Sequence, residues 1–253
     1  MKKINVNDPK NEILQKYLRS FSCLKTSLGV TLLESDFEKK LDEFNTTQSL
    51  PATINGLHQS TISFSNTWSR NSGKLISLFK KSKTREVRHF FQLHKDTIEK
   101  GTHNDVVALF LLPICFKVTK TFKEGNATIS YSKEEISRSF ILNVQDPENV
   151  DTEVKEYENW LQQRNLPILP YVVLCGEIGR IYQSYVIFNG EKYPHVDPVK
   201  AVESCYKCLK ALDRWPTICD FVWGLLGKLV YGFDLFKSCA PVTKFLVELK
   251  RCK

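Results

Sequence analysis

The chain has 253 residues, of which 42% are hydrophobic and 25% are charged, and its formal net charge is +8. This composition is typical of a globular protein and excludes a disordered chain, and a chain of this length buries a core without disulfides or metal ions. The longest apolar run, residues 106–116, is shorter than a membrane span, which needs about 20 residues, so we expect no membrane partner.

The N-terminal part is predicted to be mainly helical. Apolar residues recur every three or four positions over residues 8–21, after an Asp-Pro pair typical of a helix start. A second helix is expected to begin at Ser35, because Ser35 and Glu38 match a capping box. Residues 45–66 are rich in Thr, Ser, Asn and Gly, which predicts a connecting loop.

Positive charge is concentrated in residues 66–100, which hold nine basic and three acidic residues. Two apolar patches, at residues 75–79 and 87–94, predict one long helix or two helices, with basic residues between the patches. A localised basic surface attracts polyanions, nucleic acid first among them. The candidate nucleic-acid-binding residues are Lys80, Lys81, Lys83, Arg85 and Arg88. The alternative is a solvated helix face that binds nothing.

In the middle of the chain, the pattern of apolar residues fits more than one type of secondary structure. The apolar run 106–114 predicts a buried helix or a buried strand, because its pattern fits both. Gly125-Asn126 predicts a turn between two short strands, and Ser132 with Glu135 predicts a second capping box.

The C-terminal part combines strands and helices. Strands are predicted at residues 140–144, 169–175, 182–188 and 191–196. Helices are predicted at residues 150–164, from 198 to the Trp-Pro pair at 215–216, at 217–233 and at 240–250. Asn189-Gly190 is a strong signal for a type I′ hairpin turn, and Pro194 places the following strand at a sheet edge.

These patterns predict an α+β (or α/β) fold. We expect a basic, mainly helical region over residues 1–104, followed by a small mixed-sheet domain over residues 105–253. That domain would carry a β-hairpin at 182–196 and flanking C-terminal helices.

Short apolar motifs between residues 106 and 233 carry a resemblance to a known family. They are the stretches LFLLP at 109–113, SFILNV at 139–144, YVIF at 185–188, AV at 201–202 and CYK at 205–207. These stretches are similar to a large set of uncharacterised proteins encoded in many copies in fish and invertebrate genomes. The resemblance implies spread with mobile elements, and it carries neither an assigned activity nor a catalytic residue to this chain.

The cysteines offer one possible metal site. A four-thiolate zinc site would combine Cys205, Cys208, Cys219 and Cys239, but only the first two form a close pair. They fall inside a predicted amphipathic helix, where residues three apart share a face, so we interpret them as core residues and expect no metal and no other cofactor. No apolar export signal follows the N-terminus, which predicts an intracellular protein, nuclear or cytoplasmic, with reduced thiols.

No catalytic centre is predicted. His195 with Asp197 is the most suggestive pair for nucleophilic catalysis, yet a single histidine at a strand end is more often structural. The G-x-x-G motif over residues 176–179 resembles clamps on a nucleic-acid backbone, but predicted strands flank it and we interpret it as a turn. We therefore predict a non-enzymatic binding or regulatory protein that associates with DNA or RNA through its basic helical face. A protein-interaction module for an acidic protein is the alternative, and an enzyme with an unknown substrate is a third possibility.

Overall fold

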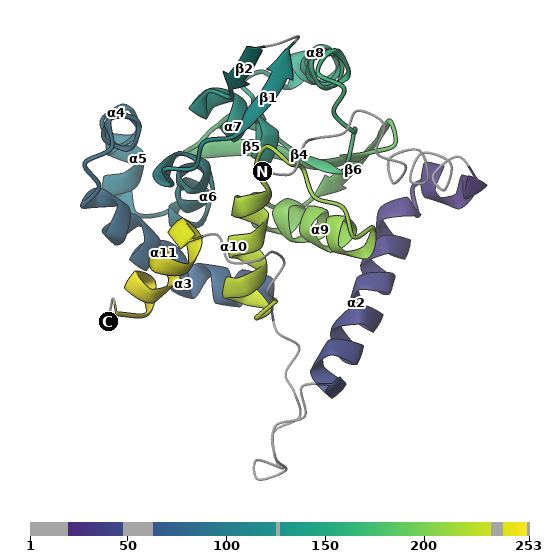
Figure 1. The fold of residues 1–253 in the computed structure, drawn as a ribbon, viewed down its shortest axis with the longest axis horizontal. Coiled ribbons are helices and arrows are strands. Elements are labelled where there is room, and N and C mark those ends of the chain that lie inside the picture. Colours follow the sequence, from purple (N-terminus) through teal and green to yellow (C-terminus); the bar gives the residue numbers. More distant parts are fainter. Residues whose placement is uncertain (1–19, 48–62, 125–126, 234–239, 252–253) are drawn as a thin grey trace.

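A computed structural model of the chain describes residues 20–47, 63–124, 127–233 and 240–251 (Figure 1). The helices of the N-terminal part are η1 (Ser22–Lys25), α2 (Gly29–Thr47), α3 (Phe64–Lys80), α4 (Arg85–Leu93), α5 (Lys95–Lys100) and α6 (Asn104–Cys115). The remaining helices are α7 (Lys133–Phe140), η2 (Pro147–Asn149), α8 (Val150–Gln163), α9 (Pro198–Ala211), α10 (Asp220–Val230) and α11 (Ala240–Arg251). The strands are β1 (Thr121–Glu124), β2 (Ala127–Ser130), β3 (Ile141–Val144), β4 (Tyr171–Glu177), β5 (Arg180–Phe188) and β6 (Glu191–His195). The predicted α+β fold is confirmed; the helix predicted over 8–21 lies almost wholly outside the described residues.

A four-stranded mixed sheet in the order β3-β4-β5-β6 forms the framework of the C-terminal part. β3 and β4 are parallel and are connected through α8, whereas β4, β5 and β6 pair antiparallel as successive hairpins. α8 covers one face, where Tyr157 and Leu161 pack with Val173 of β4. α9 covers the other face, where Val202 packs with Val172. β6 lies at an edge, as Pro194 predicts.

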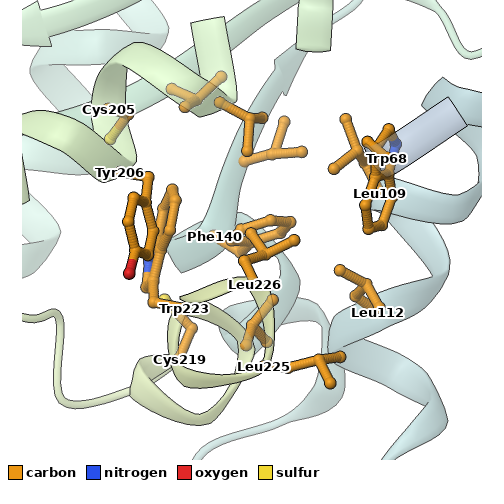
Figure 2. Packing of buried hydrophobic residues seen from close by; sticks show 14 of the residues in the cluster. Trp68, Leu109, Leu112, Phe140, Cys205, Tyr206, Cys219, Trp223, Leu225 and Leu226 are labelled. Carbon is orange, nitrogen blue, oxygen red and sulfur yellow. The ribbon is translucent and has the colours of Figure 1, made fainter. Parts of the chain in front are cut away.

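The larger hydrophobic core joins helices from both ends of the described chain. α2, α3 and α6 contribute to the same cluster of buried side chains as α9 and α10. In Figure 2, Phe140 lies in the middle of this cluster, with Trp223 of α10 to one side and Trp68 of α3 towards the other. The ring centroids of Phe140 and Trp223 are 4.9 Å apart in an edge-on arrangement, which is favourable for aromatic pairs. Buried side chains from both sides of the predicted boundary at residues 104/105 belong to this one core. The division of the chain into two domains stays a prediction.

The helix start predicted at Ser35 is wrong. α2 begins at Gly29, and Ser35 lies within it. Val30 and Leu33 are buried at 4% exposure each, so the apolar face extends more than one turn before Ser35. Glu38 does not close a capping box; its carboxylate lies 2.7 Å from the Lys207 ammonium of α9.

Three other local predictions are confirmed: the buried run, the second capping box and the two short strands. The run 106–114 is a buried helix, α6, with Pro113 near its C-terminal end. The capping box at α7 is complete, because Ser132 Oγ accepts from the Glu135 N–H and the Glu135 carboxylate accepts from the Ser132 N–H. The two strands around residues 125–126 are β1 and β2, which pair antiparallel. No described helix has the length and apolarity that crossing a membrane requires.

The β5–β6 turn makes a first prediction. Asn189 and Gly190 have φ values of 56° and 83°, the positive signs that a type I′ turn requires. No atom lies within 4 Å of a Cβ placed on Gly190, so a new side chain would meet backbone strain alone. We expect Gly190→Val to lower the free energy of unfolding by about 1–2 kcal/mol, measured by urea denaturation. Gly73 of α3 also faces open space but has a helical backbone, so Gly73→Val is the control. A Gly190→Val protein with the parent's midpoint would contradict the turn assignment.

Candidate nucleic-acid interface

The five candidate residues lie where α3 ends and α4 begins. Lys80 is the last residue of α3, Arg85 is the first of α4, and Lys81 and Lys83 lie in the connection between the helices. That connection is ordered by Ser82, whose backbone N–H donates to the Phe79 carbonyl at 2.8 Å and whose Oγ accepts from the Thr84 N–H at 3.2 Å. The basic stretch therefore forms three helices rather than the predicted one or two, with breaks at residues 81–84 and at His94.

The amphipathic helix α4 presents its arginines to solvent. Val87 is fully buried and fixes which face of α4 turns inward. Arg85 and Arg88 lie on the opposite side, and together with His89 they line a shallow surface hollow that Glu86 and Gln92 complete. All five candidate side chains are exposed. The structure thus brings the predicted residues together on one continuous stretch of surface.

The charge of these five residues is not compensated. None of the five side chains forms an ion pair or a hydrogen bond with another residue in the described part of the chain. Several cations elsewhere have close acidic partners: Lys120 with Asp220, Arg164 with Glu135, Lys192 with Asp151 and Lys207 with Glu38. Isolated exposed lysines such as Lys25, Lys123 and Lys155 have none among the described residues, but they do not form a cluster within one short stretch of chain. Uncompensated charges produce a positive potential outside the molecule, whereas paired charges largely cancel.

α11 extends this surface with residues that the sequence reasoning missed. Phe245 of α11 stacks on Phe79 of α3 with ring centroids 5.3 Å apart, and it also contacts Phe116 at 5.0 Å. Figure 1 shows α11 beside α3. The residues next to these rings in sequence are Lys80, Lys117 and Lys244, and each of these lysines is exposed. No local pattern could reveal this grouping, because tertiary contacts between segments far apart in the chain create it.

The name basic surface is used below for these exposed cations together with Lys250 and Arg251, the last two residues of α11, which are also exposed. Its members are Lys80, Lys81, Lys83, Arg85, Arg88, Lys117, Lys244, Lys250 and Arg251. The four cations from Lys117 and α11 also have no ion-pair partner among the described residues.

Three of the four cysteines of the possible zinc site occupy core positions. Cys205 and Cys208 lie on α9, Cys219 directly precedes α10, and all three are buried. Burial raises the pKa of each thiol, that of Cys219 to about 12. The Cys219 S–H donates to the Ser139 carbonyl at 3.2 Å. No group of three His, Cys, Asp or Glu side chains in the described ranges is placed to hold a metal ion, and Cys239 lies outside them.

This arrangement makes a second prediction. The purified protein is expected to contain no stoichiometric metal, as measured by elemental analysis. Because their thiols are buried and protonated at neutral pH, Cys205, Cys208 and Cys219 should react with a thiol reagent only after denaturation. The exposed Cys23 is the internal control, because it should react in the native protein. About one zinc per chain would refute the interpretation of these cysteines as core residues.

His195 and Asp197 do not form a catalytic pair. The Asp197 carboxylate accepts a hydrogen bond from the Lys200 N–H at 2.8 Å and so caps α9. His195 Nε2 has no hydrogen-bond partner among the described residues. Burial lowers the pKa of His195, against the opposing effect of nearby Glu34 and other carboxylates. In the G-x-x-G motif, Ile178-Gly179 forms the turn between β4 and β5, so the interpretation as a turn is confirmed.

Comparison of the chain with protein-family models, curated proteins and solved structures finds no match. The resemblance over residues 106–233 therefore stays a prediction. The functional argument rests on the geometry and charge of the basic surface.

Proposed function

We propose that the chain is a non-enzymatic binding protein that associates with nucleic acid through the basic surface. The observation that carries this proposal is the concentration, within residues 80–88, of five exposed cations that form no ion pair with the described residues: Lys80, Lys81, Lys83, Arg85 and Arg88. Unpaired cations on a folded surface repel one another, and an anionic ligand relieves that repulsion.

The basic surface suits the phosphate backbone better than base edges. Its cations lie on the ends of two helices, on the connection between them and on α11, so they are spread over the surface rather than directed into one groove. Each cation can neutralise a phosphate and release a counterion. Arg85 and Arg88 can in addition donate two parallel N–H bonds to one phosphate. Contacts of this kind position a protein on nucleic acid and carry little sequence information.

The proposal is tested by measuring binding of the full chain to a labelled random-sequence duplex and a labelled single strand by fluorescence anisotropy. We expect the logarithm of the association constant to fall linearly with the logarithm of the salt concentration. If five cations each contact one phosphate, the slope on duplex is about −4 to −5. Failure to bind either probe at low salt would overturn the proposal. The same residues would then be tested against acidic proteins, the alternative partner class.

A further inference from the structure

Tyr182 is an exposed aromatic side chain near the start of β5, close in sequence to the β4–β5 turn. Its exposure is 54%, although it belongs to β5, whose later residues Val186 and Phe188 are buried. Large aromatic residues are usually buried, so a ring that a strand turns towards solvent calls for an explanation.

A β-bulge directs Tyr182 outwards. Along the β4–β5 ladder, Cys175 pairs with Gln183 and Gly176 pairs with Ile181, so Tyr182 is the extra residue without a partner on β4. The bulge changes which residues of β5 face the core. Ile181, which directly precedes Tyr182, packs against the hydrophobic core. Bulges commonly re-aim a side chain near a functional site.

The opposite strand is adapted to this bulge. Gly176 has a φ of +116°, and a Cβ at that position would lie 2.7 Å from the Tyr182 ring carbon Cδ2. Glycine is therefore needed both for the backbone and for the approach of the ring. The Arg180 guanidinium carbon lies 5.1 Å from the centroid of the Tyr182 ring, within the range of a cation–π contact.

The tip of the β4–β5 hairpin lies against α5. A Cβ on Gly179 would be 2.8 Å from Thr97 Oγ1, which shows how closely the turn approaches that helix. α5 directly follows α4, the helix that carries Arg85 and Arg88. The β4–β5 hairpin that carries Tyr182 therefore lies beside the helix that continues the chain after α4.

We infer that Tyr182 is a base-stacking platform, and that the preferred ligand of the basic surface is single-stranded nucleic acid. This inference rests on the proposed function and adds the class of ligand. In a duplex the faces of the bases are covered by their neighbours, whereas a single strand can place a base on an exposed ring. Proteins that hold single strands combine a cationic track for the backbone with such rings, and this stacking is tolerant of sequence.

The decisive experiment compares Tyr182→Ala with the parent on a single strand and on a duplex, each over a range of salt concentrations. Loss of the ring should weaken single-strand binding by roughly 5- to 150-fold, the range for one stacked base. Duplex affinity should stay within about twofold, and the salt slope should be unchanged because no phosphate contact is lost. Tyr182→Phe keeps the ring and should bind the single strand like the parent.

A matched control removes another exposed aromatic ring. Phe21 is 45% exposed and precedes η1, which Figure 1 shows on the side of the molecule away from α4 and α5. Phe21→Ala should leave both affinities unchanged. Parent-like single-strand binding by folded Tyr182→Ala, or an equal loss on both probes, would overturn the inference while the proposed function stands. A parent that binds neither probe would overturn both.

Discussion

Reversing the charge of four residues of the basic surface is expected to lower nucleic-acid affinity by about 100-fold or more at low salt. The variant replaces Lys80, Lys81, Lys83 and Arg85 with Glu. If each residue contacts one phosphate, the salt slope on duplex should become shallower by about 3 to 4, because fewer counterions are released. The fold should survive, since all four side chains are exposed and lack partners among the described residues. Anisotropy titrations at several salt concentrations measure both quantities.

The control reverses four exposed lysines outside the basic surface. They are Lys25 of η1, Lys39 of α2, Lys123 of β1 and Lys155 of α8. Both variants change the formal net charge from +8 to zero, so net charge alone cannot distinguish them. A large loss only in the first variant identifies a local interface. Equal losses in both variants would show that binding follows total charge, and the location proposed for the interface would be wrong.

Removing the ring of Phe37 is expected to destabilise the protein strongly. Phe37 of α2 is fully buried and meets Tyr206 of α9 and Tyr231 edge-on, at 6.1 Å and 5.2 Å between ring centroids. Phe37→Ala should cost about 3–5 kcal/mol through lost burial and the cavity that remains. That is a large share of the stability of a typical protein, about 5–15 kcal/mol. Urea denaturation followed by circular dichroism gives the midpoint.

Leu32 provides the comparison on the same helix. It is 41% exposed, so Leu32→Ala should change stability by no more than about 0.5 kcal/mol. Because Phe37 joins α2 to the C-terminal helices, Phe37→Ala should shift one cooperative transition of the whole chain. A parent-like midpoint for Phe37→Ala would contradict the burial of this ring in the shared core. A second transition unaffected by the change would show that residues before α6 fold separately.

Local patterns predicted those parts of the fold whose cause is local. The capping box at Ser132 and Glu135 is satisfied within a single turn, and the Asn189-Gly190 turn depends on the freedom of two residues to take positive φ. The same capping-box pattern gave a wrong helix start at Ser35. Burial of Val30 and Leu33 in a longer α2 stabilises the fold more than an N-cap at Ser35 would. The long-range partner of Glu38, Lys207, was not visible from the spacing of residues.

The candidate site was predicted only in part, for the same reason. The cluster from Lys80 to Arg88 is contiguous in sequence, so composition was sufficient to find it. The contribution of α11 depends on Phe245 meeting Phe79 across the fold. The bulge at Tyr182 depends on how β5 pairs with β4, and Gly176 was interpreted as part of the turn after a strand that ends at residue 175, so the bulge was not predicted.

The contact between α2 and α9 has a consequence for synthesis on the ribosome. The ion pair between Glu38 and Lys207 joins residues 169 positions apart, and the apolar face of α2 is buried against the same helix. Because the ribosome adds roughly 5–20 residues per second, synthesis of the chain from α2 to α9 takes about 10 to 30 seconds. During that interval Phe37 and Leu41 face water or another protein. The nascent chain should therefore be a substrate for chaperones that hold apolar helices, and release should follow the emergence of α9.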